Sequence, residues 1–360
     1  MNMKKHWFKA VLFVMASVTW LASCDENDSI PEPPVEVKSV GAYFVNNGNW
    51  KQNNGSIQFY DYETGNVSGD LYKMANGKGI GDAQDLCIYG SKLYVACSTS
   101  SKIEVLTFDG KIIKTLNMVN DADQPMQPRY LEAAEGCVYF TSYDGTVSRL
   151  DTLSLEVDKS VEVGPYPEAL SYVGGKLYVN ISNYSTGNQV AVVDLSTFTK
   201  EKDIEVLLNP YNQSLVADGK IYFVSCGTYD NPDIPVEERI LQTLQCLDPA
   251  TGEVKKLCQA STIAYYNQKM YCIYADYYTP EKTDIFVYDL KTGTQQSIIS
   301  TADIANPTQI DVDPSNGDIY ISSPDYTGAP STVYVFNNDG TPKKTLEAGI
   351  SVAGVRFLQQ

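Results

Sequence analysis

Short apolar runs alternate with turns of glycine, aspartate and asparagine from about residue 40 to the end of the chain. One of these runs recurs seven times, and its most complete copy is Gly-Lys-Leu-Tyr-Val at 175–179. The tyrosines of the seven copies are Tyr43, Tyr94, Tyr139, Tyr178, Tyr222, Tyr271 and Tyr320. A repeat of roughly 40 to 50 residues is typical of stacked or radial arrays, in which each unit buries its apolar face against the next.

Each repeat contains four strand-like segments. Around Tyr178 they are Pro167–Val173, Lys176–Asn180, Gln189–Asp194 and Thr199–Val206. Apolar and polar residues alternate with period two in these segments, and no helical period follows the first 24 residues. The pattern predicts an all-β chain that forms a seven-bladed β-propeller of four-stranded antiparallel blades.

The two ends of the repeat region are incomplete in complementary ways. Ser351–Leu358 reads as a first strand without the rest of its blade, and Ala42–Val45 reads as a second strand without its first. We therefore predict that residues 40–360 form one domain, closed by pairing the C-terminal strand with the N-terminal strands. Closure of this kind leaves no open sheet edge.

The segment before the repeats predicts export and anchoring. Residues 1–23 combine Lys4 and Lys5 with a short apolar run, and Leu21-Ala-Ser-Cys24 resembles a lipobox. This is the pattern of a lipoprotein signal peptide, with lipidation expected at Cys24. Residues 24–39 are acidic and proline-rich and read as an extended tether. The acidic run Asp25-Glu-Asn-Asp28 resembles the export signal that places lipoproteins of the Bacteroidetes on the outer face of the outer membrane, and this resemblance implies a lipid-anchored protein that faces the cell exterior.

Composition narrows the functional classes. The formal net charge is −17, and removal of a leader that carries Lys4, Lys5 and Lys9 makes the chain more acidic. Such a surface repels phosphate backbones, so nucleic acid is not an expected partner and the membrane is reached only through the anchor. His6 is the only histidine and lies in the leader. The exported chain therefore lacks an imidazole base, and we predict that it is not an enzyme and needs no cofactor or metal.

The strand order sorts the loops into two faces. Loops between first and second strands, and between third and fourth, are short turns. Loops between second and third strands, and between blades, lie on the other face, are longer, and are rich in tyrosine and asparagine. Aromatic and amide side chains gathered on one face suit a flat or polar organic ligand, which could be a small molecule, a glycan or a peptide. The candidate ligand-binding residues are Asn47, Trp50, Asp85, Arg129, Tyr143, Glu168, Tyr184, Tyr211, Asn212, Tyr229, Tyr277 and Tyr326.

Two other residue groups have simpler interpretations. Seven cysteines remain once Cys24 is lipidated, none in a metal-binding spacing, and we expect buried free thiols, although an exported protein can also hold a disulfide. The acidic run Asp311–Asp318 departs from the calcium-loop pattern and is expected to be a turn.

The repeats resemble the seven-bladed YncE-like propellers, and more closely the surface-layer-like DUF5074 lipoproteins of the Bacteroidetes. The Asn46-Asn-Gly-Asn-Trp50 opening, Asn54-Gly-Ser56 and the repeated Gly-Lys-Leu-Tyr-Val phrase carry this resemblance over roughly residues 40–360. The resemblance extends to the BtuG-type lipoproteins, which capture cobalamin and pass it to a TonB-dependent transporter. It therefore implies a propeller fold, an anchor and cobalamin, as bound ligand and not as cofactor, but it transfers no individual contact residue.

Two alternatives stay open at this point. One is a protein-interaction or surface-layer-like structural module, which would need no small-molecule ligand. The other is a lactonase- or lyase-like enzyme, which without histidine would have to hold a metal through carboxylates such as Asp82, Asp85, Glu168 and Asp276. A propeller fold alone does not choose among these functions.

Overall fold

The computed structural model of the chain describes residues 37–228, 233–275, 280–302 and 304–360. The predicted leader, the lipidation site Cys24 and nearly all of the tether lie outside these ranges. Within the described ranges, no helix has the length and apolar character needed to cross a membrane.

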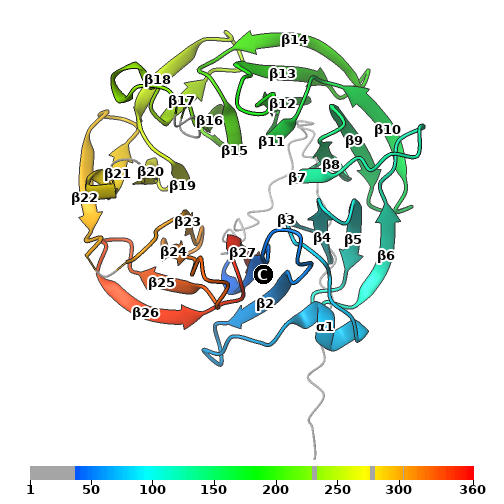
Figure 1. The fold of residues 1–360 in the computed structure, drawn as a ribbon, viewed down its shortest axis with the longest axis horizontal. Helices are drawn as coiled ribbons and strands as arrows, with labels where there is room; N and C mark the ends of the chain where they lie inside the picture. The colour runs from blue at the N-terminus through cyan, green and yellow to red at the C-terminus, as the bar shows by residue number, and fades with distance from the viewer. Residues whose placement is uncertain (1–36, 229–232, 276–279, 303) are drawn as a thin grey trace, which may run out of the picture.

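Seven antiparallel sheets stand around a central axis, as predicted (Figure 1). In the described ranges, six sheets have four strands and the seventh has three. From the axis outward the six are β3 (Asp85–Tyr89), β4 (Lys92–Cys97), β5 (Lys102–Leu106) and β6 (Ile112–Asn117); β7 (Pro128–Ala134), β8 (Cys137–Ser142), β9 (Thr146–Asp151) and β10 (Val157–Glu162); β11 (Pro167–Val173), β12 (Lys176–Ile181), β13 (Gln189–Asp194) and β14 (Thr199–Glu205); β15 (Pro210–Ala217), β16 (Lys220–Ser225), β17 (Thr243–Leu247) and β18 (Val254–Gln259); β19 (Thr262–Tyr266), β20 (Lys269–Tyr274), β21 (Asp284–Asp289) and β22 (Gln295–Ile299); β23 (Gln309–Val312), β24 (Ile319–Ser323), β25 (Thr332–Phe336) and β26 (Pro342–Glu347).

The position of a strand within its blade explains its sequence. Second strands are covered by blades on both sides, so β8 is buried at all six positions. The outermost strand β10 alternates between half-buried and exposed residues, because only one of its faces meets a neighbouring blade. The turns that follow third strands are fixed by aspartate. Asp289, for example, accepts hydrogen bonds from the backbone N–H groups of Lys291 and Thr292 at 2.9 and 2.8 Å.

The repeated tyrosines hold the blades together. In the described part of the chain, seven hydrophobic clusters fill the seven interfaces between neighbouring sheets. Each cluster contains one tyrosine of the repeated phrase, and all seven side chains are buried. The 40- to 50-residue period of the sequence is therefore the period of inter-blade packing.

The ring closes where the two ends of the repeat region meet. β27 (Val352–Gln359) is the innermost strand of the closing sheet, β1 (Ser39–Asn46) pairs with it, and β2 (Ser56–Asp61) lies outside β1. Phe44 faces Val355 in this register, and Lys38 N donates to Gln360 O at 3.0 Å. The predicted closure is confirmed.

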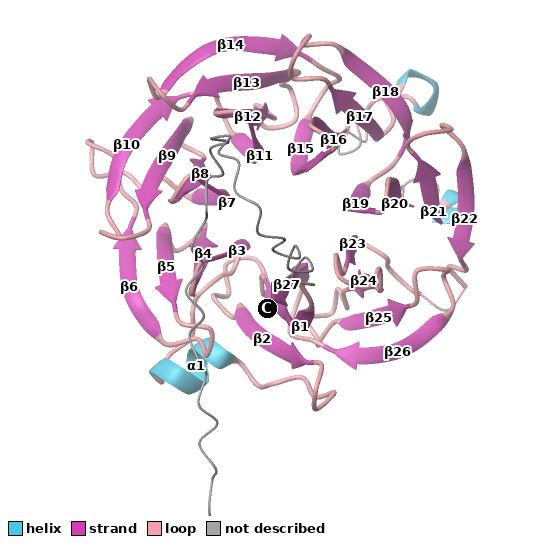
Figure 2. Ribbon diagram, turned by 180° about the vertical axis from the view of Figure 1, so that it is seen from behind, coloured by secondary structure: helices cyan, strands magenta, loops and turns pink. Residues whose placement is uncertain are grey.

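The predicted fold is confirmed, and only the closing sheet departs from the pattern of the other six. In the closing sheet the fourth strand is reduced to a bridge between Tyr60 and Val67, followed by helix α1 (Leu71–Asn76) at the outer rim of the ring (Figure 2). Asp70 caps its first turn, and Gly77, with φ of 70°, ends it. Tyr72 anchors the helix by donating its hydroxyl to the buried Glu104 at 2.9 Å. The short 3₁₀ helices η1 (Val236–Glu238) and η2 (Pro280–Lys282) lie in loops.

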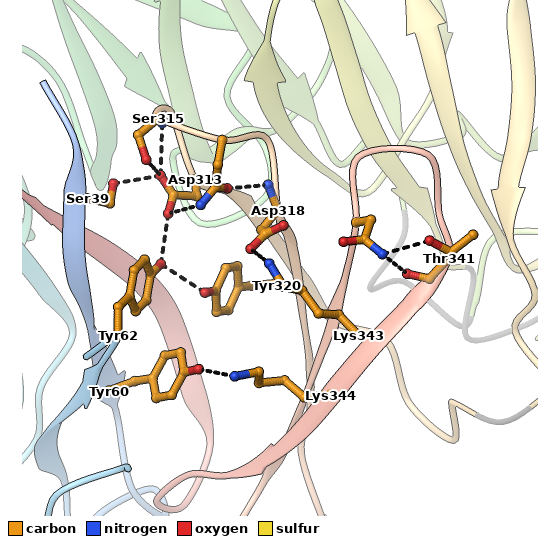
Figure 3. A network of polar contacts seen from close by, with 12 residues as sticks. Ser39, Tyr60, Tyr62, Asp313, Ser315, Asp318, Tyr320, Thr341, Lys343 and Lys344 are labelled. Carbon is orange, nitrogen blue, oxygen red and sulfur yellow. Dashed lines mark hydrogen bonds and ion pairs between the residues drawn. The ribbon is translucent and has the colours of Figure 1, made fainter. Parts of the chain in front are cut away.

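A buried polar network ties the closing sheet to the preceding blade. Asp313, which is 0% exposed, accepts hydrogen bonds from the Ser39 hydroxyl at 2.6 Å and the Tyr62 hydroxyl at 2.8 Å (Figure 3). The Tyr62 and Tyr320 hydroxyls lie 2.8 Å apart. We call Ser39, Tyr62, Asp313 and Tyr320 the closure network.

Asp313 belongs to the acidic run Asp311–Asp318, and this run is a turn, as expected. Gly317 N donates to Asp313 O at 2.8 Å, and Ser315 N donates to the Asp313 carboxylate at 2.9 Å. The acidic residues therefore shape the connection between β23 and β24, and Asp313 in addition reaches across to the N-terminal strands.

Candidate functional site

The long loops share one face of the ring. Loops between second and third strands are hydrogen-bonded to the loops that enter the next first strand. Gly55 N donates to Gly81 O at 2.7 Å, and Asn209 N donates to Gly187 O at 2.6 Å. We call this side the long-loop face and the opposite side the short-turn face. A hollow of about 350 Å³ on the short-turn face, between the β11–β14 and β15–β18 sheets, has a single aromatic residue, Tyr178, in its lining.

Exposed aromatic side chains gather on the long-loop face. In the described ranges, the aromatic residues classed as exposed are Trp50, Tyr166, Tyr184 and Tyr326, at 80%, 37%, 77% and 74%. All four lie in loops of this face, and the described short-turn face has none. A single exposed apolar residue is ordinary, but four aromatic rings confined to one side indicate a contact surface.

Three tyrosines form a continuous series of ring contacts. The ring centroids of Tyr143 and Tyr166 are 5.1 Å apart, and those of Tyr166 and Tyr184 are 5.3 Å apart. We call Tyr143, Tyr166 and Tyr184 the tyrosine ladder. It runs from a half-buried ring at Tyr143 to a ring at Tyr184 that is largely in solvent.

The loop that presents Tyr184 has an unusual backbone. Asn183, Tyr184 and Ser185 have φ values of 42°, 51° and 73°, three successive residues in the left-handed region that non-glycine residues rarely adopt. The loop is held in place by Gly187, where an added Cβ would lie 2.2 Å from Ile181 O. Strained backbone of this kind is concentrated at functional sites, because elsewhere its cost brings no benefit.

Beneath the ladder lies a buried ion pair. Arg129 and Glu168 are 8% and 1% exposed, and Arg129 Nε and Nη2 donate to Glu168 Oε2 at 3.2 and 3.1 Å. The other carboxylate oxygen, Oε1, accepts hydrogen bonds from Tyr143 OH at 3.2 Å and Ser182 Oγ at 3.3 Å. The guanidinium also lies over the Tyr143 ring, 4.5 Å from its centroid, which is a cation–π contact.

The ion pair is stable only because each charge has a partner. Burial raises the pKa of Glu168, while the Arg129 guanidinium and the hydrogen bonds from Arg129, Tyr143 and Ser182 oppose that rise. Burial alone would lower the pKa of Arg129, but the neighbouring Tyr130, Glu168 and Tyr143 raise it, so the guanidinium stays charged. The site thus places a fixed positive group among tyrosine rings.

Residues at the equivalent position of three successive blades surround the Arg129–Glu168 ion pair. Arg129, Glu168 and Tyr211 each follow the proline that begins an innermost strand, in β7, β11 and β15. Tyr211 is half-buried, and Asn180 Nδ2 donates to its carbonyl oxygen at 2.9 Å. The structure therefore brings together Arg129, Tyr143, Glu168, Tyr184 and Tyr211 of the candidate residues, with Asn212 beside them in β15.

Other candidate residues occupy different places. Asn47 Nδ2 donates to Gln84 Oε1 at 3.1 Å, and Gln84 Nε2 donates to Tyr130 OH at 3.3 Å, so Asn47 reaches the centre through two side chains. Trp50 and Tyr326 lie in two adjoining loops on the opposite side of the axis, where a Cβ added to Gly328 would lie 3.0 Å from Asn49. Tyr229 and Tyr277 lie outside the described residues.

Asp85 belongs to a separate charged group on the axis. Arg356 Nη2 donates to Asp85 Oδ1 at 2.7 Å, and its Nη1 lies 3.6 Å from Asp311 Oδ1. The Arg356 side chain is 34% exposed although it belongs to the innermost strand β27, so it faces solvent along the axis. Asp85 Oδ2 also accepts from Leu131 N at 2.9 Å, which links β3 to β7. Among its described contacts, Asp85 therefore pairs with Arg356 and not with Arg129.

Two of the other carboxylates weighed as metal ligands, Asp82 and Glu168, have protein partners. Asp82 accepts hydrogen bonds from Thr99 N at 2.8 Å and from Ser100 N at 3.2 Å, so it shapes a loop. Glu168 is paired with Arg129, and Asp276 lies outside the described residues.

Several contributors were missed from the sequence. Tyr166, Ser182 and Arg356 were not among the candidate residues. The sequence did contain an indication of Tyr166, since this residue directly precedes Pro167 at the start of an innermost strand. No local sequence pattern could indicate the role of Arg356, because its partner Asp85 is 271 positions away in the chain.

Glu132, half-buried on β7, gives a pH-dependent prediction. Burial raises its pKa to about 7; the hydrogen bond from Tyr172 N opposes this rise and the Asp85 carboxylate adds to it. The folded chain therefore holds a proton that the unfolded chain releases near pH 4.5, so this contribution to stability is full below pH 4.5 and is lost as the pH rises to about 7. Replacing Glu132 by glutamine should raise the free energy of unfolding by about 1–3 kcal/mol at pH 8 and leave it unchanged at pH 4.

Denaturant unfolding at the two pH values measures this effect. The matched control is Glu135→Gln, which changes an exposed glutamate near the same strand and should give no gain at pH 8. Equal stability of the Glu132→Gln variant and the unmodified chain at pH 8 would contradict the shifted pKa.

Comparisons with known proteins agree with this architecture. The family model "Domain of unknown function (DUF5074)" matches residues 40–349. No curated protein matches the chain.

Solved structures with the same fold include three of differing function. A quinonprotein alcohol dehydrogenase-like protein from Bacteroides thetaiotaomicron is 17% identical with a TM-score of 0.63, over 89% of this chain and 78% of that one. The hydrazine synthase of Kuenenia stuttgartiensis is 14% identical with a TM-score of 0.58, over 75% of this chain and 88% of that one. The Pan2 WD40 domain of Neurospora crassa is 14% identical with a TM-score of 0.56, over 76% and 80%. Identities this low show the fold alone.

Proposed function

The chain belongs to the DUF5074 family, and from this membership and the long-loop face we propose that it is a non-enzymatic capture protein that binds a bulky polar organic molecule on that face. The ligand that we propose is cobalamin or another corrinoid. The protein would hold it at the outer surface of the outer membrane, anchored through Cys24, and pass it to a TonB-dependent transporter.

One observation carries the proposal: the exposed aromatic residues of the described chain lie on one face, and two of them, Tyr166 and Tyr184, adjoin a buried guanidinium through Tyr143. Aromatic rings supply large contact areas at small conformational cost, and buried polar groups beneath them fix the orientation of a ligand. A corrinoid combines a broad apolar ring with amide side chains. It can therefore contact the Tyr166 and Tyr184 rings and also offer amide oxygens to hydrogen-bond donors.

The absence of histidine from the exported chain supports binding over catalysis, because the commonest general base is missing. The sequence resemblance supports the choice of cobalamin, and the lipobox at Cys24 supports the anchor. A protein-interaction or surface-layer role is the competing function, and the same face would serve it.

Titration calorimetry of residues 25–360 with cyanocobalamin tests the proposal, with a glycan mixture as a second ligand. We expect tight one-to-one binding of cyanocobalamin. Replacing Tyr184 by alanine should weaken binding about 10-fold or more, or ~1.4 kcal/mol, because a ligand would cover a ring that is 77% exposed in the free protein.

Leu153→Ala is the matched control, since Leu153 is 91% exposed in a turn of the short-turn face. It should bind cyanocobalamin like the unmodified chain, and neither variant should lose stability. Absence of heat at high protein concentration would overturn the cobalamin proposal. Binding heat with the glycans alone would indicate a saccharide ligand instead. Absence of binding heat with both ligands would favour a protein partner.

A further inference from the structure

Three cysteines meet at one interface between blades. Cys246 and Cys258 belong to the β15–β18 sheet and Cys272 to the neighbouring β19–β22 sheet, and all three pack into the same hydrophobic cluster. Cys272 is fully buried, whereas Cys258 is only partly buried. One thiol of this group is therefore reachable from solvent and one of its neighbours is not.

A β-bulge aims Cys258 at the interface. In the pairing of β17 with β18, Leu244 faces Cys258 but Gln245 faces Lys256, so Leu257 is an extra residue. Without it, strict alternation would place Cys258 on the same side as the exposed Lys256. With the bulge, Leu257 and Cys258 both pack against the cluster. The outermost strand thus directs a thiol toward the adjacent blade.

Cys258 and Cys272 enter this cluster from its two opposite sheets. The Cys272 thiol donates to Met270 O at 3.7 Å within its own strand. The neighbouring Cys272 side chain lowers the pKa of Cys258, while burial raises the pKa of Cys272. Cys246 is engaged elsewhere, since its sulfur pairs with the hydroxyl of Tyr222 in its own sheet. The pair that is positioned to react therefore consists of Cys258 and Cys272.

We propose that Cys258 and Cys272 form a disulfide that joins the β15–β18 blade to the β19–β22 blade when the protein meets a disulfide oxidant. Cys258, the more exposed and more acidic thiol, attacks one sulfur of a small disulfide such as oxidised glutathione and releases one glutathione. Cys272 then attacks the Cys258 sulfur and releases the second glutathione. Two protein thiols become one S–S bond, and the two protons leave on the two glutathione thiols.

The bond would add a covalent link to an interface that is otherwise held by packing and by hydrogen bonds, such as the one that Ile263 N donates to Gln213 Oε1 at 2.7 Å. It would close a short loop that contains the turn into β19 and the whole of that strand. An exported protein meets oxidising conditions, so the linked form is expected outside the cytoplasm. This inference does not depend on the ligand, and its test is independent of the cobalamin titration.

The test uses the full-length protein, purified in detergent under reducing conditions and then exposed to oxidised glutathione. After alkylation and proteolysis without reductant, mass spectrometry should find the peptides of Cys258 and Cys272 linked, with two fewer thiols titrated. The oxidised protein should melt roughly 5 °C or more above the reduced protein.

Cys258→Ser should abolish the link and the rise in melting temperature. Cys246→Ser, a change in the same cluster, should keep both. A link between Cys246 and either partner, or two freely alkylated thiols at Cys258 and Cys272 after oxidation, would overturn the proposal. Mass spectrometry of the oxidised unmodified chain tests the Cys258–Cys272 link even if a serine variant folds poorly.

Discussion

Replacing Arg129 by methionine is expected to lower the free energy of unfolding at pH 8 by about 3–5 kcal/mol, because it leaves a buried carboxylate without its counter-charge. Glu168 is 1% exposed and would keep only the hydroxyl donors of Tyr143 and Ser182. Methionine fills much of the volume of the arginine stem, so the loss reports the charge more than a cavity. Denaturant unfolding of the two proteins measures it.

The loss of unfolding free energy in the Arg129→Met variant should become smaller as the pH falls. Burial already raises the pKa of Glu168, and removal of the Arg129 guanidinium removes the main opposing influence. A carboxyl whose pKa is higher in the folded than in the unfolded state stabilises the fold at low pH and loses that contribution as the pH rises. We therefore expect a smaller difference between the variant and the unmodified chain at pH 4 than at pH 8.

Two further variants separate the buried pair from arginine loss in general. In the Arg129→Met, Glu168→Gln double variant no charge remains buried, so most of the lost stability should return. Arg149→Met removes a more exposed pair with Asp158, whose side chain is 43% exposed, and should cost less than about 1 kcal/mol. Equal costs for the two single arginine variants would contradict a special role of the Arg129–Glu168 pair.

The sequence predicts the blades well because their determinants are local and repeated. The segments Pro167–Val173 and Gln189–Asp194 were predicted with the bounds that the structure has. The repeated tyrosines signal inter-blade packing because every blade needs the same contact. The closing strands were predicted because the N-terminal segment lacks a first strand and the C-terminal segment supplies one.

The site was predicted only in part, because its contacts join residues that no period relates. Arg129 and Glu168 could be chosen as candidates because both were predicted to lie on the long-loop face. Nothing in the sequence indicated that they form an ion pair with each other. The left-handed backbone at Asn183 suits an asparagine, but it continues through Tyr184 and Ser185, which rarely adopt it, so turn chemistry did not indicate this loop. Helix α1 was missed because six residues are too few for a helical period to be recognised.

Replacing Asp313 by alanine should lower the free energy of unfolding by about 2–4 kcal/mol, since the half-buried hydroxyls of Ser39 and Tyr62 would lose this acceptor. These bonds span 274 and 251 residues, so they link the N-terminal strands to the blade built just before the C-terminal strand. Loss of such a link weakens the joint at which the ring closes. Amide hydrogen exchange should therefore accelerate first in β1 and β27, before the other innermost strands.

Asp339→Ala supplies the matched control, because Asp339 caps the neighbouring β25–β26 turn through Thr341 N at 2.9 Å and makes no contact with the N-terminal strands among its described hydrogen bonds. This substitution should cost no more than about 1 kcal/mol and leave exchange in β1 and β27 unchanged. If both variants lost equal stability, Asp313 would act only on its own turn. If Asp313→Ala accelerated exchange evenly around the ring, closure would not be the weakest joint of the propeller. Selective acceleration in β1 and β27 would instead show that a buried polar network, and not strand pairing alone, keeps the two chain ends together.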